Sequence, residues 1–210
     1  PILCNNLYQY GIPFTDTTYH TCAINSDVFT KDIENFAKIC RIVSGLKGLR
    51  VAQIGTRPAA FQTVRYSEKL LQKIGVQVIP VDMAEITFAA LSQEENEEVR
   101  EVAGRIRAYG TLEDGVADEN VINQAKLYVT IKKWMKENDC QAGSLQCWDA
   151  VQKNYGCATC LTMSMLGEEG IPMSCEGDVM GAVTMYAMYL ASLSPSGYLD
   201  WNNSFGEDRN

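Results

Sequence analysis

Two carboxylates one residue apart form the first pair of side chains whose types and spacing suggest chemistry. Glu176 and Asp178 directly follow a short apolar segment, with Gly177 between them. Paired carboxylates are hard oxygen ligands for Mg²⁺ or Mn²⁺, and a carboxylate can also act as a general base. The same pattern suits the start of a helix, with Asp178 as the N-cap and Glu176 adding charge near the helix N-terminus. Both interpretations are open at this point.

The cysteines offer a second kind of chemistry. The chain has eight of them, and Cys157-Ala-Thr-Cys160 has the spacing of a redox pair or of half a zinc site. A thiol-metal module built on Cys147, Cys157, Cys160 and Cys175 is one alternative. Buried, unreactive thiols are the other, since the chain holds a single histidine, His20, and the motif does not follow a strand in a βαβ pattern.

Two further loops carry side chains suited to contact a ligand. In Gly55-Thr-Arg-Pro58, the guanidinium of Arg57 lies at a predicted helix entrance, where it could hold an anion or a polyol. Trp148 could pack on the apolar face of a sugar, or lie in the core. The phosphate-binding patterns G-x-x-x-x-G-K-S/T and G-x-G-x-x-G are absent, so nucleotide binding loses its usual support.

Alternating apolar segments predict the elements that position these loops. Strands are expected over residues 49–54, 76–81, 141–148 and 171–175. Helices are expected over residues 26–44, 61–74, 83–91, 118–138, 149–167 (unbroken or broken) and 180–193, with another opening at the capping box Ser92-x-x-Glu95. This order predicts an α/β fold, an open doubly wound parallel sheet of the Rossmann or flavodoxin-like kind. Such sheets bind ligands beyond the carboxyl ends of their strands.

We expect three regions along the chain. Residues 1–45 form an N-terminal arm left from a preceding domain, with a strand, loops and a linking helix. Residues 46–194 form the α/β substrate-binding domain, and residues 195–210 start a missing C-terminal β-rich domain. The chain begins at Pro1 and ends on a polar run, which predicts that it is a piece of a longer protein.

Composition narrows the class of protein. The 210 residues are 46% hydrophobic and 21% charged, the make-up of a globular protein. The net charge of −8 argues against binding to nucleic acid. The longest near-apolar stretch, Met180 to Leu193, is shorter than the roughly 20 residues that span a membrane. Without a visible secretory leader, we expect a cytoplasmic protein with reduced thiols.

Four segments, occurring in order, resemble the middle part of L-fucose/L-arabinose isomerase-like proteins: Arg50–Pro58, Gln146–Asp149, Tyr155–Cys160 and Ile171–Ala182. The resemblance covers roughly residues 45–193, and Cys175–Ala182 is its most specific part. It implies a divalent-metal-dependent aldose–ketose isomerase that acts on a small-molecule sugar, a pentose or 6-deoxyhexose such as L-fucose or L-arabinose. It also implies Mn²⁺ (or Mg²⁺) in the full-length protein, and a homo-oligomer, trimer or hexamer.

The resemblance also assigns roles to residues. It places a metal-binding aspartate at Asp178, and we expect Glu176 to join it as a catalytic and metal-binding carboxylate. We expect Arg57 and Trp148 to contact the substrate. The family's second acidic ligand would fall near Cys157–Cys160, where this sequence has no carboxylate, and its metal-binding histidine belongs to the later domain. A non-catalytic sugar-binding relative is therefore the alternative function, and the isolated 210 residues are predicted to be inactive.

Overall fold

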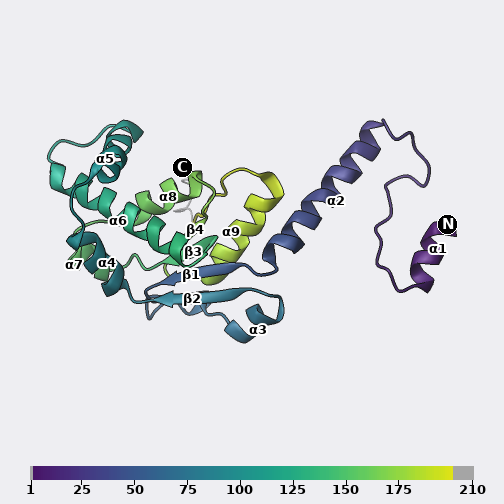
Figure 1. Ribbon diagram of the computed structural model, residues 1–210, viewed down its shortest axis with the longest axis horizontal. Coiled ribbons are helices and arrows are strands. Elements are labelled where there is room, and N and C mark those ends of the chain that lie inside the picture. The colour runs from purple at the N-terminus through teal and green to yellow at the C-terminus, as the bar shows by residue number, and fades with distance from the viewer. Residues whose placement is uncertain (1, 201–210) are drawn as a thin grey trace, which may run out of the picture. The chain divides into compact units, whose positions relative to one another are not determined.

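The computed structural model describes residues 2–200, which fall into two compact units divided between Arg41 and Ile42. The N-terminal unit contains helix α1, Ile2–Gln9, and the first part of helix α2, Asp27–Leu46 (Figure 1). The strand expected in the first 26 residues is not found among those described, and a helix stands there instead. Leu3 and Leu7 are four residues apart, the spacing of one helical face, and the asparagines between them obscure this signal.

The second unit is built on a four-stranded sheet. Its strands are β1 (Arg50–Ile54), β2 (Gln77–Val81), β3 (Ala142–Leu145) and β4 (Met173–Cys175). They pair in the order β2-β1-β3-β4, and all three pairings are parallel (Figure 1). Ile54 is in register with Val81 and Leu145, and Leu145 with Cys175, so the four strands finish at one edge. The predicted open parallel α/β sheet is confirmed.

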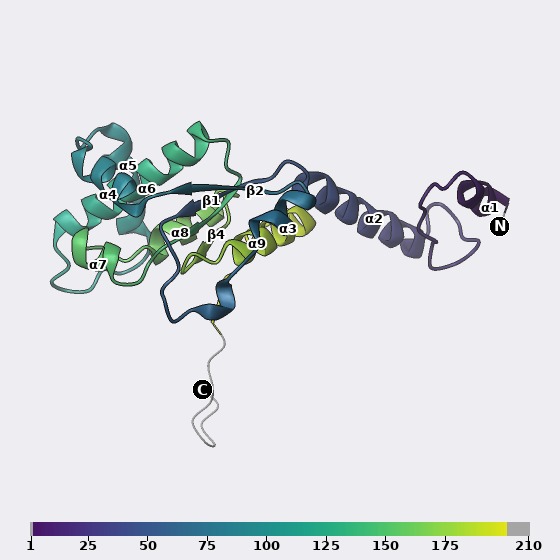
Figure 2. The ribbon, with the colours of Figure 1, turned by 90° about the horizontal axis from the view of Figure 1, so that it is seen from below.

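Helices cover both faces of the sheet (Figure 2). Strand residues that face opposite ways enter two separate cores. Val51 packs with Leu71 of α3 (Glu68–Lys73) and Val179 of α9 (Val179–Ser192), whereas its neighbour Ala52 enters the other core. That second core is formed largely by α4 (Met83–Ser92), α5 (Glu97–Tyr109), α6 (Asp118–Glu137) and α8 (Cys160–Glu168). Between residues 42 and 200 this unit also contains the 3₁₀ turn η1 (Gln62–Val64) and α7 (Ala150–Asn154).

Two predicted helices begin or end elsewhere than expected. The helix predicted over residues 61–74 consists of only η1 and the short α3. The helix expected to open at Ser92 begins at Glu97, because Asn96 serves as its N-cap and accepts a hydrogen bond from the Val99 amide at 2.9 Å. The segment 149–167 is broken into α7 and α8, one of the two forms expected.

An ionic cluster ties the end of α8 to α5 and α6. Glu169 accepts hydrogen bonds from Arg105 at 2.8 Å, Lys132 at 2.6 Å and the Tyr128 hydroxyl. Burial opposes ionisation of Glu169, but these three donors outweigh it and hold its pKa down at about 2. The cluster therefore fixes the helical layer on one side of the sheet.

The predicted start of a β-rich domain at residues 195–210 lies largely outside the described residues, and residues 195–200 form no helix or strand. The domain boundaries at residues 45 and 194 stay predictions. No helix within residues 2–200 combines the length and apolarity that crossing a lipid bilayer requires.

Candidate functional site

The loops that follow β1, β3 and β4 pack directly on one another. Gln146, after β3, accepts a hydrogen bond from the Thr56 amide at 3.0 Å through its side-chain oxygen. Gly177, after β4, approaches the β1 loop so closely that a Cβ there would lie 2.8 Å from the backbone nitrogen of Arg57. The carboxyl edge of the sheet is thus a closely packed group of loops, at the place where open parallel sheets bind ligands.

The turn between β4 and α9 holds both predicted carboxylates. Glu176 and Gly177 have left-handed backbone, with φ of +64° and +69°. A non-glycine residue adopts this conformation rarely, and such residues are enriched at functional sites. The unusual backbone turns the chain sharply between the end of β4 and the start of α9, and it separates the directions of Glu176 and Asp178.

Asp178 is the N-cap of α9. One carboxylate oxygen accepts from the Gly181 amide at 2.9 Å, and the other accepts from the Tyr198 hydroxyl, also at 2.9 Å. The capping interpretation of the Glu-x-Asp pattern is therefore correct for Asp178. A metal-binding role for the same residue stays a prediction, since each carboxylate oxygen has a second lone pair.

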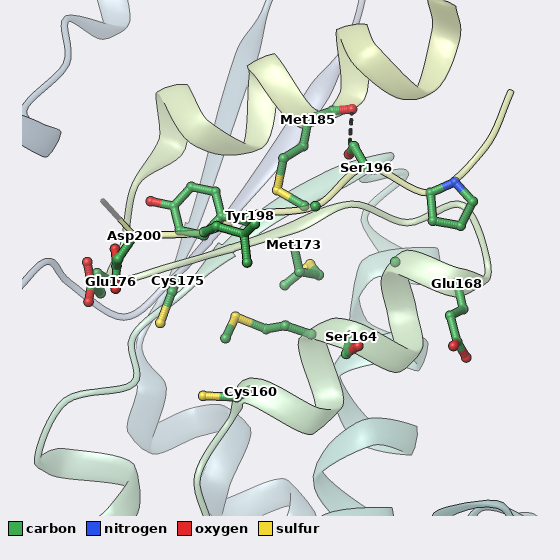
Figure 3. A pocket seen from close by; sticks show the side chains of 15 residues that line it. Cys160, Ser164, Glu168, Met173, Cys175, Glu176, Met185, Ser196, Tyr198 and Asp200 are labelled. Carbon is green, nitrogen blue, oxygen red and sulfur yellow. Dashed lines mark hydrogen bonds between the residues drawn. The ribbon is translucent and has the colours of Figure 1, made fainter. Parts of the chain in front are cut away.

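Glu176 instead lines a cavity of about 500 Å³ beneath the segment 195–200. Figure 3 shows its carboxylate close to that of Asp200 at one end of the cavity, with Glu168 at the other end. The thiols of Cys160 and Cys175 also point into this space (Figure 3). Among the described residues lining the cavity there is no lysine or arginine, so its acidic end has no cation within its own walls.

The electrostatics of Glu176 follow from this arrangement. Burial raises the pKa of its carboxyl group, and the negative charges of Asp200 and Asp178 raise it further. Both effects penalise the ionised form of Glu176. A bound cation would reverse the second effect and offset the first. Glu176 therefore fits the carboxylate ligand of a hard divalent cation, and its raised pKa also suits a group that exchanges a proton.

Arg57 and Trp148 lie outside this cavity. One guanidinium nitrogen of Arg57 donates to the carbonyl oxygens of Pro58 and Ala59, each at 3.1 Å, which secures its own loop. Arg57 lines a neighbouring hollow of about 260 Å³ together with Arg65, among other residues. Trp148 is 55% exposed and packs edge-to-face on Phe61 with ring centroids 5.3 Å apart. Contact of either residue with a substrate stays a prediction.

The structure selects two of the four cysteines that the sequence grouped together. The sulfur atoms of Cys147 and Cys175 are 2.9 Å apart, and together with a carboxylate oxygen of Glu176 they lie within 4.8 Å of one another. Cys160 lines the cavity, whereas Cys157 lies in the core and donates to the Asn120 carbonyl at 3.6 Å. The C-x-x-C spacing therefore does not bring its own two thiols into this cluster.

Sequence reasoning missed two residues of the site. The Tyr198 hydroxyl donates a hydrogen bond to Asp178. The negative charge of Asp200 raises the pKa of Glu176 more than the charge of Asp178 does. Tyr198 and Asp200 lie beyond α9, in a stretch with no periodic pattern. No motif in Tyr198-Leu-Asp200 pointed to either residue.

Residues 2–47 match the N-terminal domain of fucose/sulfoquinovose isomerase. The chain is also similar to several curated proteins called sulfoquinovose isomerase. It is 26% identical to the one from Priestia aryabhattai over 151 residues, which are 71% of this chain and 33% of that protein. It is 28% identical to the one from Clostridium sp. (strain MSTE9) over 182 residues, which are 85% of this chain and 38% of that protein.

The chain thus spans about a third of the length of these curated relatives. Two independent comparisons, one with a domain family and one with whole proteins, lead to the same group of sugar isomerases. The predicted resemblance to the L-fucose isomerase-like family is therefore confirmed.

Proposed function

We propose that this chain is the substrate-binding part of an aldose–ketose isomerase that requires a divalent cation. The observation that carries the proposal is Glu176, a partly buried carboxylate on a cavity wall at the carboxyl edge of the sheet, beside Asp200 and without a cation in that wall. The relatives, called sulfoquinovose isomerases, support the reaction class.

The reaction asks two things of such a site. A proton must move between neighbouring carbons of the sugar, and negative charge that develops on their oxygens must be stabilised. Glu176 is placed to exchange the proton, because it lines the cavity in which the sugar would lie. Mn²⁺ or Mg²⁺, when bound, would supply positive charge for the sugar oxygens. Glu176 and Asp178 are our proposed ligands from this chain.

The charges around the site bear on the substrate. Sulfoquinovose carries an anionic sulfonate, whereas L-fucose and L-arabinose are neutral. The cavity wall near Glu176 is acidic, so an anionic group would be repelled there. Arg57 and Arg65, together with Gly177, line a separate hollow where their positive charges could attract it. We therefore propose sulfoquinovose as the first substrate to test, with the two neutral sugars beside it.

Metal-dependent turnover by the full-length protein tests this proposal. Each of the three sugars is incubated with metal-free protein before and after addition of Mn²⁺, and ketose formation is measured. We expect Glu176→Gln to lower kcat by at least about 100-fold. Glu168→Gln is the matched control, because Glu168 lines the opposite end of the same cavity. Equal activity in the two variants would rule out the proposed role of Glu176.

A non-catalytic sugar-binding protein is the second candidate. The observation that favours it is Cys160, which presents a thiol to the cavity where the family resemblance leads us to expect a carboxylate nearby. Manganese titration separates the two candidates. Binding that Asp178→Asn and Glu176→Gln weaken supports the isomerase, whereas sugar binding without any manganese binding supports the second candidate.

A further inference from the structure

Two strand ends bring a pair of thiols and a carboxylate together. Cys175 is the last residue of β4, and Cys147 lies two residues beyond the end of β3, its neighbour in the sheet. Their sulfur atoms are 2.9 Å apart, and Glu176 completes a group whose ligand atoms lie within 4.8 Å of one another. The three donors are thus set by the pairing of two strands rather than by one flexible loop.

The donor set suits a different cation from the one proposed for the sugar reaction. Thiolates prefer zinc and cadmium, whereas Mn²⁺ and Mg²⁺ prefer oxygen ligands alone. With Zn–S bonds of about 2.3 Å, tetrahedral geometry places two sulfur atoms about 3.8 Å apart. The two thiols need to separate by roughly 0.9 Å to reach that distance, a shift within the reach of side-chain rotation. Cadmium, a larger ion, would require a somewhat wider opening.

Access to the group is through the cavity. Cys175 and Glu176 both line it, whereas Cys147 lies behind them and is only 4% exposed. A cation entering from the cavity would meet Glu176 and Cys175 first and then Cys147. Its remaining position would face the cavity, open to water.

We propose that Cys147, Cys175 and Glu176 form a binding site for a thiol-preferring divalent cation such as Zn²⁺, which shares Glu176 with the oxygen-ligated site proposed for the isomerase but takes its other ligands from the two thiols. Binding there engages Glu176 and so withdraws it from the sugar reaction. Zinc is then an inhibitor of the enzyme rather than its cofactor. The binding stands on the geometry alone, and only the inhibition rests on the proposed isomerase function.

Cadmium titration of the reduced, metal-free, full-length protein tests the binding. Cadmium–thiolate bonds absorb in the ultraviolet, so the probe reports sulfur ligation directly. We expect about one Cd²⁺ per chain in this absorbance, displaced by Zn²⁺. Cys147→Ser and Cys175→Ser should each weaken binding by at least about 100-fold, more than the loss typical of residues outside the ligand shell. Glu176→Gln should weaken it while leaving the absorbance detectable.

Cys157→Ser is the matched control, because Cys157 is also buried but lies in the core away from the cluster. It should keep the full absorbance. Cys147→Ala gives a second variant if serine at this buried position prevents folding. The proposal is overturned if Cys147→Ser and Cys157→Ser bind cadmium equally. It is also overturned if the thiols of Cys147 and Cys175 are found joined in a disulfide that reductant does not open.

Inhibition is measured separately, with Mn²⁺ and sugar present. Zinc should inhibit the native protein. Cys147→Ser should resist zinc because it lacks one of the three ligands, and it should keep its turnover because Cys147 does not line the cavity. The two proposals fail in different ways. A protein with normal cadmium absorbance but no turnover contradicts the isomerase alone, whereas turnover without cadmium absorbance contradicts the thiol site alone.

Discussion

Replacing Gly177 by alanine should disrupt the contact that positions the two carboxylates. Gly177 has a φ of +69°, and a Cβ there would lie 2.8 Å from the backbone nitrogen and 3.1 Å from the Cα of Arg57. These are backbone atoms, which cannot rotate away as the end of a long side chain can. The β1 loop or the β4 loop must therefore shift, and Glu176 and Asp178 flank the residue that moves.

The expected loss combines two costs. A left-handed backbone costs a non-glycine residue about 1–2 kcal/mol. Overpacking a close contact adds about 1–3 kcal/mol. We therefore expect Gly177→Ala to lower the free energy of unfolding by about 2–5 kcal/mol. Gly156→Ala isolates the first cost, because Gly156 has a φ of +84° and nothing lies within 4 Å of its added Cβ.

Urea unfolding of the full-length protein and both variants measures these losses. Gly177→Ala should lose about 1–3 kcal/mol more than Gly156→Ala, the share that comes from the contact. It should also bind Mn²⁺ more weakly, whereas Gly156→Ala should bind as the native protein does. Equal losses of stability in the two variants would refute the reasoning, since the contact with the β1 loop would then contribute nothing.

Three further predictions concern single carboxylates. In the metal-free protein, Glu176→Gln should raise the melting temperature near pH 7 but not near pH 4. Burial, and then the two neighbouring carboxylates, raise the pKa of Glu176 in the folded state. The native protein therefore loses stability as the pH rises through that folded-state pKa, whereas the glutamine variant does not. No change in melting temperature across that range would contradict this. Asp178→Ala should cost about 1 kcal/mol in urea unfolding through its lost capping bond, and Asp178→Asn should cost less. Glu169→Gln should cost about 1–2 kcal/mol at pH 7 after allowance for solvent screening, since the pKa of Glu169 is lowered to about 2. That cost should disappear as the pH falls from about 4.5 towards 2, and a cost that persists there would exclude the ionised carboxylate as its source.

The sheet could be predicted because its strands are short apolar segments bounded by glycine or polar residues. The helix predicted over residues 61–74 could not be corrected from sequence, because distant residues break it. Phe61 packs on Trp148, and the Tyr66 hydroxyl bonds to Gln53 on β1. Both contacts hold residues 61–67 in a looser path than a helix would take, and only α3 continues from there.

The site was predictable where neighbours in sequence are neighbours in space. Glu176 and Asp178 were found in this way. Cys147 and Cys175 were predicted only as members of a larger group with Cys157 and Cys160. The sequence could not single them out, because they meet only through the pairing of β3 with β4. Asp200 gave no signal either, since its effect on Glu176 depends on how the chain folds back after α9.

The stability of the fold accounts for the presence of one carboxylate of the Glu-x-Asp pattern but not for that of the other. Asp178 accepts two hydrogen bonds and caps a helix, so its presence is accounted for without any ligand. Glu176 combines left-handed backbone, partial burial and negative neighbours, and each of these three features opposes stability. A cation at the cavity wall would reverse the electrostatic penalty from the neighbouring carboxylates and offset that of burial. Replacing Glu176 by glutamine should therefore stabilise the metal-free protein and lower its activity at the same time, so that experiments can measure the two effects separately.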